Sequence, residues 1–351
     1  MNKVNHSILM IGLLVISVTT SAQDSIYCID LEQSAFEHYD LLNQDMQGKK
    51  IIMLGEMHYK AANSILKADL LIHLNKHFGV RQLLMEFGRA EAYLYNSYLE
   101  SGDEWYLKQT TFGFREYQEF LTSWRRLYDY HKGLPEHKKL KVHGLDLERE
   151  PGLSASLYTL LAEYASDPEV ESLRNSLKVR LDTIGVERDN HDFILELRER
   201  IPRLSLPPDE NGQVIDAILN NESFLKRMDK RDSLMAEAFM ALDTTDEAYF
   251  GQFGFAHTGL NAKNSLAGVL NNLEEYRDKI MVVNMYYIDT NKGNFPLQNL
   301  SDCPIFLYKI DPQDEQYGGF AKRGQWALIL KDQPNYRTVE NIEIDLSEVY
   351  E

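Results

Sequence analysis

Cysteine is scarce in this chain of 351 residues, which contains only Cys28 and Cys303. Two thiols are too few for a cysteine-based metal site. A lipid anchor on Cys28 is not expected, because Ser25-Ile26-Tyr27 lacks the small residues that normally precede a lipidated cysteine. An oxidising compartment would allow a disulfide between the two cysteines, but the sequence does not show how far apart they lie in space.

Long apolar runs are missing after the N-terminal segment. That segment contains Lys3, the apolar stretch Ile8–Val18 and small residues up to Ala22, a combination typical of a cleavable signal peptide. The apolar stretch is too short to span a bilayer as a helix. We therefore predict a signal peptide over residues 1–22 and an exported protein, periplasmic or secreted, without stable membrane insertion.

Basic residues are outnumbered, with 37 Lys and Arg against 54 Asp and Glu and a net charge of −17. Because binding to phosphates needs a basic surface, this balance argues against a nucleic-acid partner. The shares of hydrophobic residues (44%) and charged residues (26%) are those of an ordinary globular protein. We expect a small-molecule or peptide substrate as the partner.

Internal repeats are absent, and the order of the predicted elements indicates the fold instead. Apolar runs predict strands at Lys49–Leu54, Val80–Phe87 and Leu140–Leu145. Apolar residues at helical spacing predict helices at Leu31–Leu42, Asn63–Phe78, Glu91–Leu99 and Arg115–His131. Strands that alternate with helices indicate an α/β fold with a mostly parallel central sheet flanked by helices.

A long stretch without strands follows, over about residues 153–243. It reads as a series of helices and predicts a helical insertion or cap on a single α/β domain spanning residues 23–351. The segments expected to form helices are Leu157–Tyr164, Glu169–Ile184, Phe193–Ile201, Val214–Leu219 and Ser223–Leu242. Strands are predicted again at Tyr249–Ala256, Lys279–Tyr287, Pro304–Ile310 and Trp326–Leu330, so the last third of the chain completes the sheet.

Polar side chains follow four of the predicted strands where each strand ends. Glu56 and His58 follow the first strand, Glu86 the second, Asp146 the third, and His257 a later one. Ligands of parallel α/β sheets bind at the carboxyl ends of the strands. These residues are therefore the candidates for a functional site.

The pair Glu56 and His58 has residue types suited to acid–base chemistry. Residues at i and i+2 of an extended backbone point to the same side, and Gly55 between the strand and this pair permits a close approach. A carboxylate beside an imidazole orients the ring and raises its basicity, so a water held by His58 would be a usable nucleophile. The alternative is that both residues cap the following helix.

The other three candidates also have structural alternatives. Glu86 lies in an apolar strand, where a carboxylate is costly to bury unless it is functional or paired with Arg81 or Arg89. His257 follows two glycines that do not form a phosphate-binding loop, and its alternative is a structural histidine with satisfied hydrogen bonds. Asp146 has helix capping as its alternative. A Gly-x-Ser-x-Gly elbow is absent, which disfavours a serine hydrolase of the α/β-hydrolase kind.

Four motifs, taken in order, resemble the erythromycin esterase family over about residues 50–290. They are Leu54-Gly55-Glu56-Met57-His58, Met85-Glu86-Phe87, the helix segment Phe120–Asp129 (FLTSWRRLYD) and Val142-His143-Gly144-Leu145-Asp146. The later histidine of the family would correspond to His257. One residue separates Glu56 from His58, where the esterases commonly have two; this spacing is closer to the haem-binding ChaN-like proteins and the TraB/TIKI metalloproteases of the wider superfamily.

The resemblance implies a hydrolase and a role for each candidate. His58 would be the general base that activates water, Glu56 and Glu86 would orient it, and His257 would assist the leaving group or the oxyanion. Substrate-binding residues would be Lys67, Arg126 and Asp146, although Arg126 has a structural ion pair as its alternative. No cofactor is implied by this interpretation.

Two other functions stay open from the sequence. A metal-dependent hydrolase or peptidase would use Glu56, His58, Glu86 and His257 as ligands of a divalent metal, since two imidazoles and two carboxylates suit zinc, manganese or iron. A ChaN-like protein would bind haem or iron without turnover. The preferred hypothesis is a metal-independent hydrolase of ester or lactone bonds.

Overall fold

The computed structural model describes residues 26–29, 40–113, 116–183, 190–204, 206–221, 230–291 and 295–339. The predicted signal peptide over residues 1–22 and most of the predicted helix Leu31–Leu42 lie outside these residues. No helix within the described ranges is long and apolar enough to cross a membrane.

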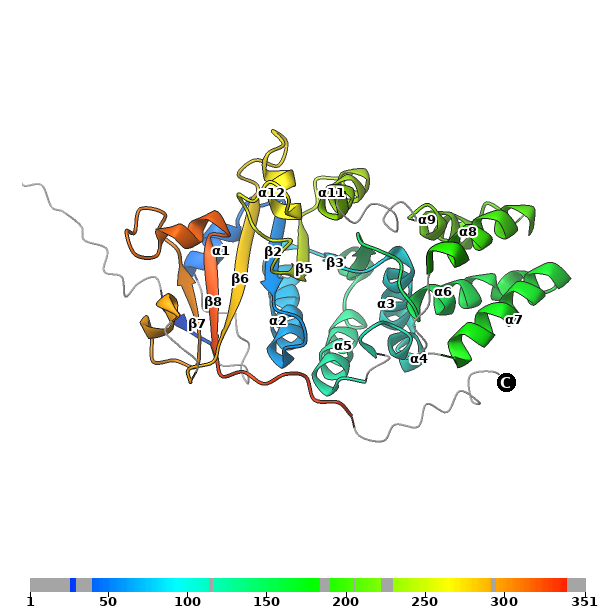
Figure 1. Cartoon of the computed structure of the whole chain (residues 1–351), viewed down its shortest axis with the longest axis horizontal. Helices are drawn as coiled ribbons and strands as arrows, with labels where there is room; N and C mark the ends of the chain where they lie inside the picture. Colours follow the sequence, from blue (N-terminus) through cyan, green and yellow to red (C-terminus); the bar gives the residue numbers. More distant parts are fainter. Residues whose placement is uncertain are drawn as a thin grey trace, which may run out of the picture.

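The central sheet is mixed and mostly parallel. Its strands are β1 (Ile26–Cys28), β2 (Ile51–Glu56), β3 (Gln82–Met85), β4 (Lys141–Gly144), β5 (Tyr249–Gly254), β6 (Ile280–Ile288), β7 (Ile305–Lys309) and β8 (Trp326–Lys331). Their order across the sheet is β1-β7-β8-β6-β2-β5-β3-β4 (Figure 1). From β8 to β4 all neighbours pair in parallel, whereas β7 pairs antiparallel with both β1 and β8. The α/β fold expected from the sequence is confirmed.

Helices cover both faces of this sheet and extend beyond its β4 edge. They are α1 (Asp40–Met46), α2 (Ala61–Phe78), α3 (Arg89–Ser101), α4 (Glu104–Lys108), α5 (Gln118–His131), α6 (Gly152–Leu160), α7 (Pro168–Asp182), α8 (Asn190–Arg200), α9 (Glu210–Leu219), α11 (Arg231–Leu242) and α12 (Leu266–Asn271). Helix α2 ends at Gly79 as predicted, because φ there is 69°, a left-handed conformation that glycine adopts without a steric cost.

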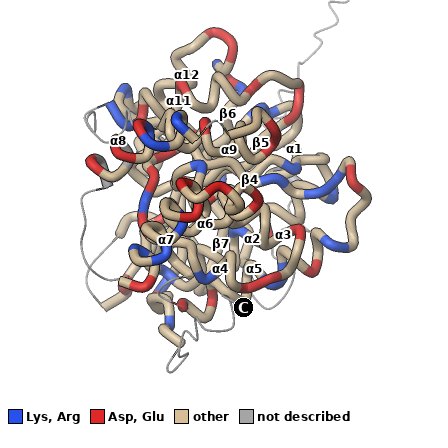
Figure 2. Tube along the Cα trace, turned by 90° about the vertical axis from the view of Figure 1, so that its right-hand side faces the viewer, with Lys and Arg blue, Asp and Glu red and all other residues tan. Residues whose placement is uncertain are grey.

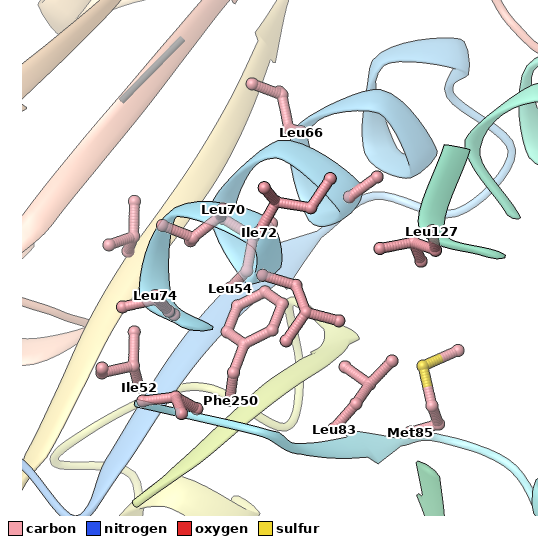
Figure 3. Packing of buried hydrophobic residues seen from close by; sticks show 14 of the residues in the cluster. Ile52, Leu54, Leu66, Leu70, Ile72, Leu74, Leu83, Met85, Leu127 and Phe250 are labelled. Carbon is pink, nitrogen blue, oxygen red and sulfur yellow. The ribbon is translucent and has the colours of Figure 1, made fainter. Parts of the chain in front are cut away.

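Strand β2 illustrates why the sheet is buried on both sides. Side chains alternate along a strand, so Ile52 and Leu54 point to one face and Ile51 and Met53 to the other. On the first face, β2 packs with β5 and α2, as Figure 3 shows for Phe250, Leu66, Leu70 and Leu74. On the second face, the packing partners from α11 are Met235 and Phe239. A continuous apolar run is the sequence pattern expected of such a doubly covered strand.

The helical stretch predicted over about residues 153–243 divides into two parts. Helices α6 to α9 form a hydrophobic cluster of their own with the start of α3, beyond the β4 edge of the sheet (Figure 1). Helix α11 instead packs on the sheet. The end of the predicted cap is therefore one of the helices that cover the sheet, and it begins beside the strand ends. In the view of Figure 2, acidic and basic positions are interspersed over the helical end of the molecule.

Cys28 and Cys303 form a disulfide, with 5.7 Å between their Cα atoms. Cys28 is the last residue of β1, a three-residue strand that pairs only with β7. Cys303 lies shortly before β7, so the disulfide joins the edge strand covalently to its neighbour.

Candidate active site

The strand-end residues predicted from the sequence come together at the carboxyl ends of the parallel strands. Glu56 is the last residue of β2, and Glu86, Asp146 and His257 follow β3, β4 and β5. These four strands are parallel neighbours, so their carboxyl ends meet. His58, two residues after β2, joins the same cluster through contacts with Glu56 and Glu86.

His58 is held by Glu56 in the orientation expected of a general base. Its Nδ1 lies 2.8 Å from Glu56 Oε1, which is hydrogen-bond distance. The hydrogen bond with Glu56 raises the pKa of His58, although burial of the ring opposes this effect. The other ring nitrogen, Nε2, lies 4.0 Å from Glu86 Oε1. With Nδ1–H donated to Glu56, the neutral ring presents the lone pair of Nε2 to the cavity.

Glu86 is a buried carboxylate that is surrounded by donors. Its Oε2 accepts the backbone N–H of Gly254 at 2.6 Å, and its Oε1 lies 2.8 Å from the Arg231 guanidinium and 3.3 Å from His257 Nε2. Burial opposes the charge, but the hydrogen bonds from His257 and Gly254 and the charge of Arg231 lower the pKa of Glu86 to about 2. Glu86 is therefore an anion at neutral pH. Its partner is Arg231 and neither of the arginines that the sequence suggested.

His257 lies between two carboxylates. Its Nδ1 is 2.7 Å from Asp232 Oδ1, and its Nε2 faces Glu86. Burial favours the neutral ring, but the hydrogen bonds with Asp232 and Glu86 raise the pKa of His257 to about 9. The imidazolium then donates from both nitrogens. His257 Nε2 lies 3.3 Å from the Arg231 guanidinium. When His257 is protonated, both groups are donors and Glu86 is the acceptor that they share.

Arg231 and Asp232 belong to the site, and sequence reasoning missed both. Arg231 donates from Nε to Asp146 Oδ1 at 2.7 Å and pairs with a second oxygen of the same carboxylate. Asp146 is completely buried and also accepts from Arg149 at 2.9 Å. Asp146 therefore positions Arg231 and does not line either cavity at the site. The only signal in the sequence was an Arg-Asp pair within a predicted helix, which is common on solvated helix surfaces.

Gly254 allows His58 and Glu86 to approach the backbone of β5. A Cβ atom at this position would lie 3.0 Å from Nε2 and Cε1 of the His58 ring and 3.1 Å from Glu86 Oε2. Contacts this short force the neighbouring atoms to move. Gly254 therefore makes room for the side chains of His58 and Glu86.

Two cavities meet at this cluster, and Glu56, His58, Glu86 and Arg231 form the wall that they share. The smaller cavity has a volume of about 370 Å³ and lies against α2 and α5. The larger has a volume of about 980 Å³ and opens on the β6 side. Such volumes are typical of sites for small molecules.

The segment that follows β8, around Tyr336, supplies one wall of the smaller cavity. Tyr336 lines it, stacks on Tyr117 with ring centroids 4.9 Å apart, and places its hydroxyl 2.5 Å from Ser64 Oγ. Backbone hydrogen bonds hold the segment in place, from Tyr336 N–H to Tyr59 at 3.0 Å and from Val339 N–H to Glu116 at 2.9 Å. The cavity is thus built from both ends of the described chain.

Lys67 is buried in α2 and lines the smaller cavity. Its ammonium lies 4.8 Å from the centre of the Trp124 ring. Burial lowers the pKa of Lys67 to about 8, against the opposing attraction of Glu56. The structure places this residue where a substrate-binding cation is expected.

Replacing Lys67 with methionine is expected to stabilise the protein at pH 7. The folded-state pKa is lowered from 10.5 to about 8, so burying the charge destabilises the folded state by about 3 kcal/mol at any pH below 8. Urea denaturation at pH 7 and pH 10 measures this, and the gain should shrink between pH 8 and 10.5 as wild-type Lys67 becomes neutral. Lys76→Met, at an exposed position of the same helix, is the control. A less stable Lys67→Met protein would contradict the prediction.

Arg126 does not join the site. It forms an ion pair with Asp69, whose carboxylate is almost completely buried, and it lines neither cavity. The structural ion pair considered from the sequence is therefore the arrangement that the structure has.

The donors suggested for a metal do not fit one. Among the residues that the structure describes, no group of three or more His, Cys, Asp or Glu side chains is arranged to hold a metal ion. Arg231 lies among the four suggested ligands, 2.8 Å from Glu86 Oε1 and 3.3 Å from His257 Nε2. A fixed guanidinium there repels a second cation. The arrangement disagrees with the metal-dependent alternative.

Comparison with known proteins identifies the fold. The chain matches no protein-family model, and no curated protein matches its sequence. Among solved structures, a mutant of the erythromycin esterase EreC in its open conformation has a TM-score of 0.58 and 15% identity, covering 92% of this chain and 100% of the other. The chain has the erythromycin esterase fold.

Two further structures share this fold. A succinoglycan biosynthesis protein superimposes with a TM-score of 0.63 at 14% identity, over 90% of this chain and 97% of the other. A Bacillus cereus protein has a TM-score of 0.56 at 14% identity, over 86% of this chain and 93% of its own. The resemblance read from four short motifs is confirmed for the fold. The names of these proteins differ, so the erythromycin esterase fold alone does not assign an activity.

Proposed function

We propose that the protein is an exported hydrolase in which His58 activates a water molecule for attack on an ester or lactone carbonyl. One observation carries the proposal: Glu56 holds Nδ1 of His58 at 2.8 Å, and His58 itself lines both cavities, so Nε2 is left for a water molecule. This is the arrangement of a base that a second group orients.

In the proposed reaction, water transfers a proton to His58 Nε2 while its oxygen forms a bond with the carbonyl carbon. The carbonyl π electrons move to the oxygen, and the tetrahedral intermediate carries a negative charge there. Lys67 and Arg231, which line the cavities, stabilise this charge electrostatically. The carbon–oxygen bond to the leaving alcohol then breaks, and the His58 imidazolium returns its proton to the departing alkoxide.

His257 acts through Glu86 in this proposal. As an imidazolium it offsets the charge of Glu86, together with Arg231, so that Glu86 stays a fixed anion at the base of the site. A fixed anion near His58 favours the imidazolium that forms during the attack. His257 thereby positions and polarises the cluster, and its proton remains between Glu86 and Asp232.

Export is proposed from two features of the chain. The first residues have the pattern of a signal peptide. The disulfide between Cys28 and Cys303 is a bond that persists in oxidising compartments. N-terminal sequencing of the protein recovered from its native compartment, with a start close to residue 23 expected, tests this part of the proposal.

Hydrolysis itself is tested with aryl esters, alkyl esters and macrocyclic lactones, followed by proton release in a pH-stat. We expect turnover that continues in EDTA. Loss of activity in the chelator, restored by added zinc or manganese, would favour the metal-dependent alternative. No turnover together with a Soret band on adding haem would favour a binding protein.

The pH dependence of kcat/KM is expected to report His58 directly. The base must be neutral, so activity should rise as pH increases through the raised pKa of His58, above 6.5. Groups facing this ring are Glu56, Glu86 and His257. Glu56→Gln keeps an acceptor for Nδ1 but removes the charge, so the acid limb should move to lower pH while the plateau falls about tenfold. An unmoved acid limb in this variant would show that another group controls it.

A further inference from the structure

The larger cavity has a wall of aromatic side chains that the proposed hydrolysis does not use. Tyr286 of β6 lies at its centre, with ring centroids 5.3 Å from Phe255, 5.4 Å from Phe295 and 5.6 Å from Phe320. All four rings line the cavity. Offset and edge-to-face arrangements of this kind bind flat apolar groups well.

The hydroxyl group of Tyr286 has no hydrogen-bond partner among the described residues, although it is buried. Burial raises the pKa of Tyr286 to about 12, so the hydroxyl is a donor at neutral pH. A buried donor without a partner destabilises the folded protein, because its hydrogen bond to water is lost and not replaced. A ligand with an oxygen acceptor in this cavity would satisfy it.

Besides Arg231, which pairs with Glu86 and Asp146, two further cations line the same cavity. Arg323 is exposed, and its guanidinium carbon lies 4.7 Å from the centre of the Phe255 ring. Lys322 is next to it in sequence and also exposed. Neither forms an ion pair with a carboxylate in the described ranges, whereas Arg81, Arg125 and Arg337 each do.

This local excess of positive charge contrasts with the net charge of −17 of the whole chain. Charge complementarity at a site selects the sign of the ligand, because an approaching like charge is repelled. Free cations beside an aromatic wall therefore select a flat group that carries a negative charge.

We infer that the larger cavity binds an aromatic or fused-ring group bearing a carboxylate or another anionic substituent. The rings of Phe255, Phe295 and Phe320 contact the flat group, Arg323 pairs with its anion, and the Tyr286 hydroxyl donates to one of its oxygens. The assignment of this group to an ester substrate rests on the proposed function. In such a substrate, the group bound in the larger cavity places the scissile carbonyl at the wall that the two cavities share.

Binding is tested with a matched pair of fluorescent probes. 8-Anilinonaphthalene-1-sulfonate has the fused ring and an anion, and N-phenyl-1-naphthylamine has the same ring system without the anion. We expect the folded protein to bind the sulfonate at least fivefold more tightly than the neutral amine. Arg323→Gln should weaken the sulfonate about tenfold and leave the amine within twofold, while Phe320→Ala should weaken both.

Arg277→Gln is the matched control. Arg277 is exposed and precedes the amino end of β6, whereas the site lies at the carboxyl ends of the strands. It should change neither affinity. Circular dichroism and urea denaturation check that each variant is folded, since partly unfolded proteins also bind the sulfonate. Equal affinities for both probes, or equal losses in Arg277→Gln and Arg323→Gln, would overturn the inference.

The outcome is separable from that of the hydrolase proposal. Probe binding without hydrolysis of any ester would leave the cavity assignment standing and reject the hydrolase. Where hydrolysis is found, the sulfonate should inhibit it competitively, and this inhibition should weaken about tenfold in Arg323→Gln. Uncompetitive inhibition, or none, would place the aromatic group of the substrate outside the larger cavity.

Discussion

Replacing His58 with alanine is expected to lower kcat for ester hydrolysis about 1,000-fold, since a positioned general base contributes about 100- to 10,000-fold. KM should change by less than threefold, because the aromatic wall and Lys67 remain. The His58 side chain is half exposed, so its removal should leave the free energy of unfolding almost unchanged. Steady-state kinetics on the best ester of the panel, with urea denaturation in parallel, measures both quantities.

His77→Ala is the control for this variant. His77 is exposed on α2, away from both cavities, and its replacement should leave kcat within twofold of wild type. Added imidazole should restore part of the activity of His58→Ala, because the space left by the side chain opens to a cavity. A His58→Ala protein with more than a tenth of the wild-type kcat would reject the role of general base.

Replacing Arg231 with alanine should lower the free energy of unfolding by about 3 kcal/mol at pH 7. This guanidinium lies against Asp146, which is completely buried, and Glu86, which is nearly so. Its removal leaves two buried carboxylates without their main cation. Chemical denaturation followed by tryptophan fluorescence measures the loss, and hydrolysis should be lost as well because the cluster loses its geometry.

Arg231→Lys separates charge from shape. Lysine keeps the positive charge but cannot donate to both carboxylates from a planar fork, so we expect it to recover about half of the lost stability. The pH dependence supplies a second check. The folded-state pKa of Glu86 is about 2 against an ordinary 4.5, so its contribution to stability is present above pH 4.5 and is lost as the pH falls towards 2.

Without Arg231 this contribution shrinks. The difference in stability between wild type and Arg231→Ala should therefore be larger at pH 7 than at pH 3. A difference that stays constant over this range would mean that Arg231 acts by packing and not by its charge.

The strands and the residues that follow them were readable from the sequence because both depend on local patterns. An apolar run followed by Glu56 and His58, or by Glu86, marks a buried strand and its polar end within a few residues. The rule that parallel strands end together then places Asp146 and His257 beside them. All of these residues lie in the predicted cluster.

Arg231 and Asp232 could not be found in this way. They lie on a helix, where a charged pair is the ordinary composition of a solvated surface, and the pattern of the helix does not reveal which face of the sheet it covers. Which face the helix covers depends on the long-range packing of residues such as Phe239 against β2 and β5. Arg126 shows the opposite error: the family resemblance implied substrate binding, whereas the fold brings Asp69 next to it and makes the ion pair that was the alternative.

Helix α4 (Glu104–Lys108) was missed for a third reason. Five residues complete little more than one turn, so no apolar periodicity can develop. Its start depends on Asp103, whose side chain accepts the N–H of Trp105 at 2.8 Å. A single capping residue is a weak signal in a sequence that is rich in aspartate.

Tyr336 has a consequence for the order in which the site assembles. A nascent chain that has folded only as far as β8 already has Glu56, His58, Glu86 and His257 in place, but the smaller cavity is still open on the side that Tyr336 covers. The site is completed only when the segment around Tyr336 docks onto Tyr59 and Tyr117. During synthesis from the N-terminus, the smaller cavity therefore closes later than the cluster of Glu56, His58, Glu86 and His257 assembles, because one of its walls follows β8 in the chain.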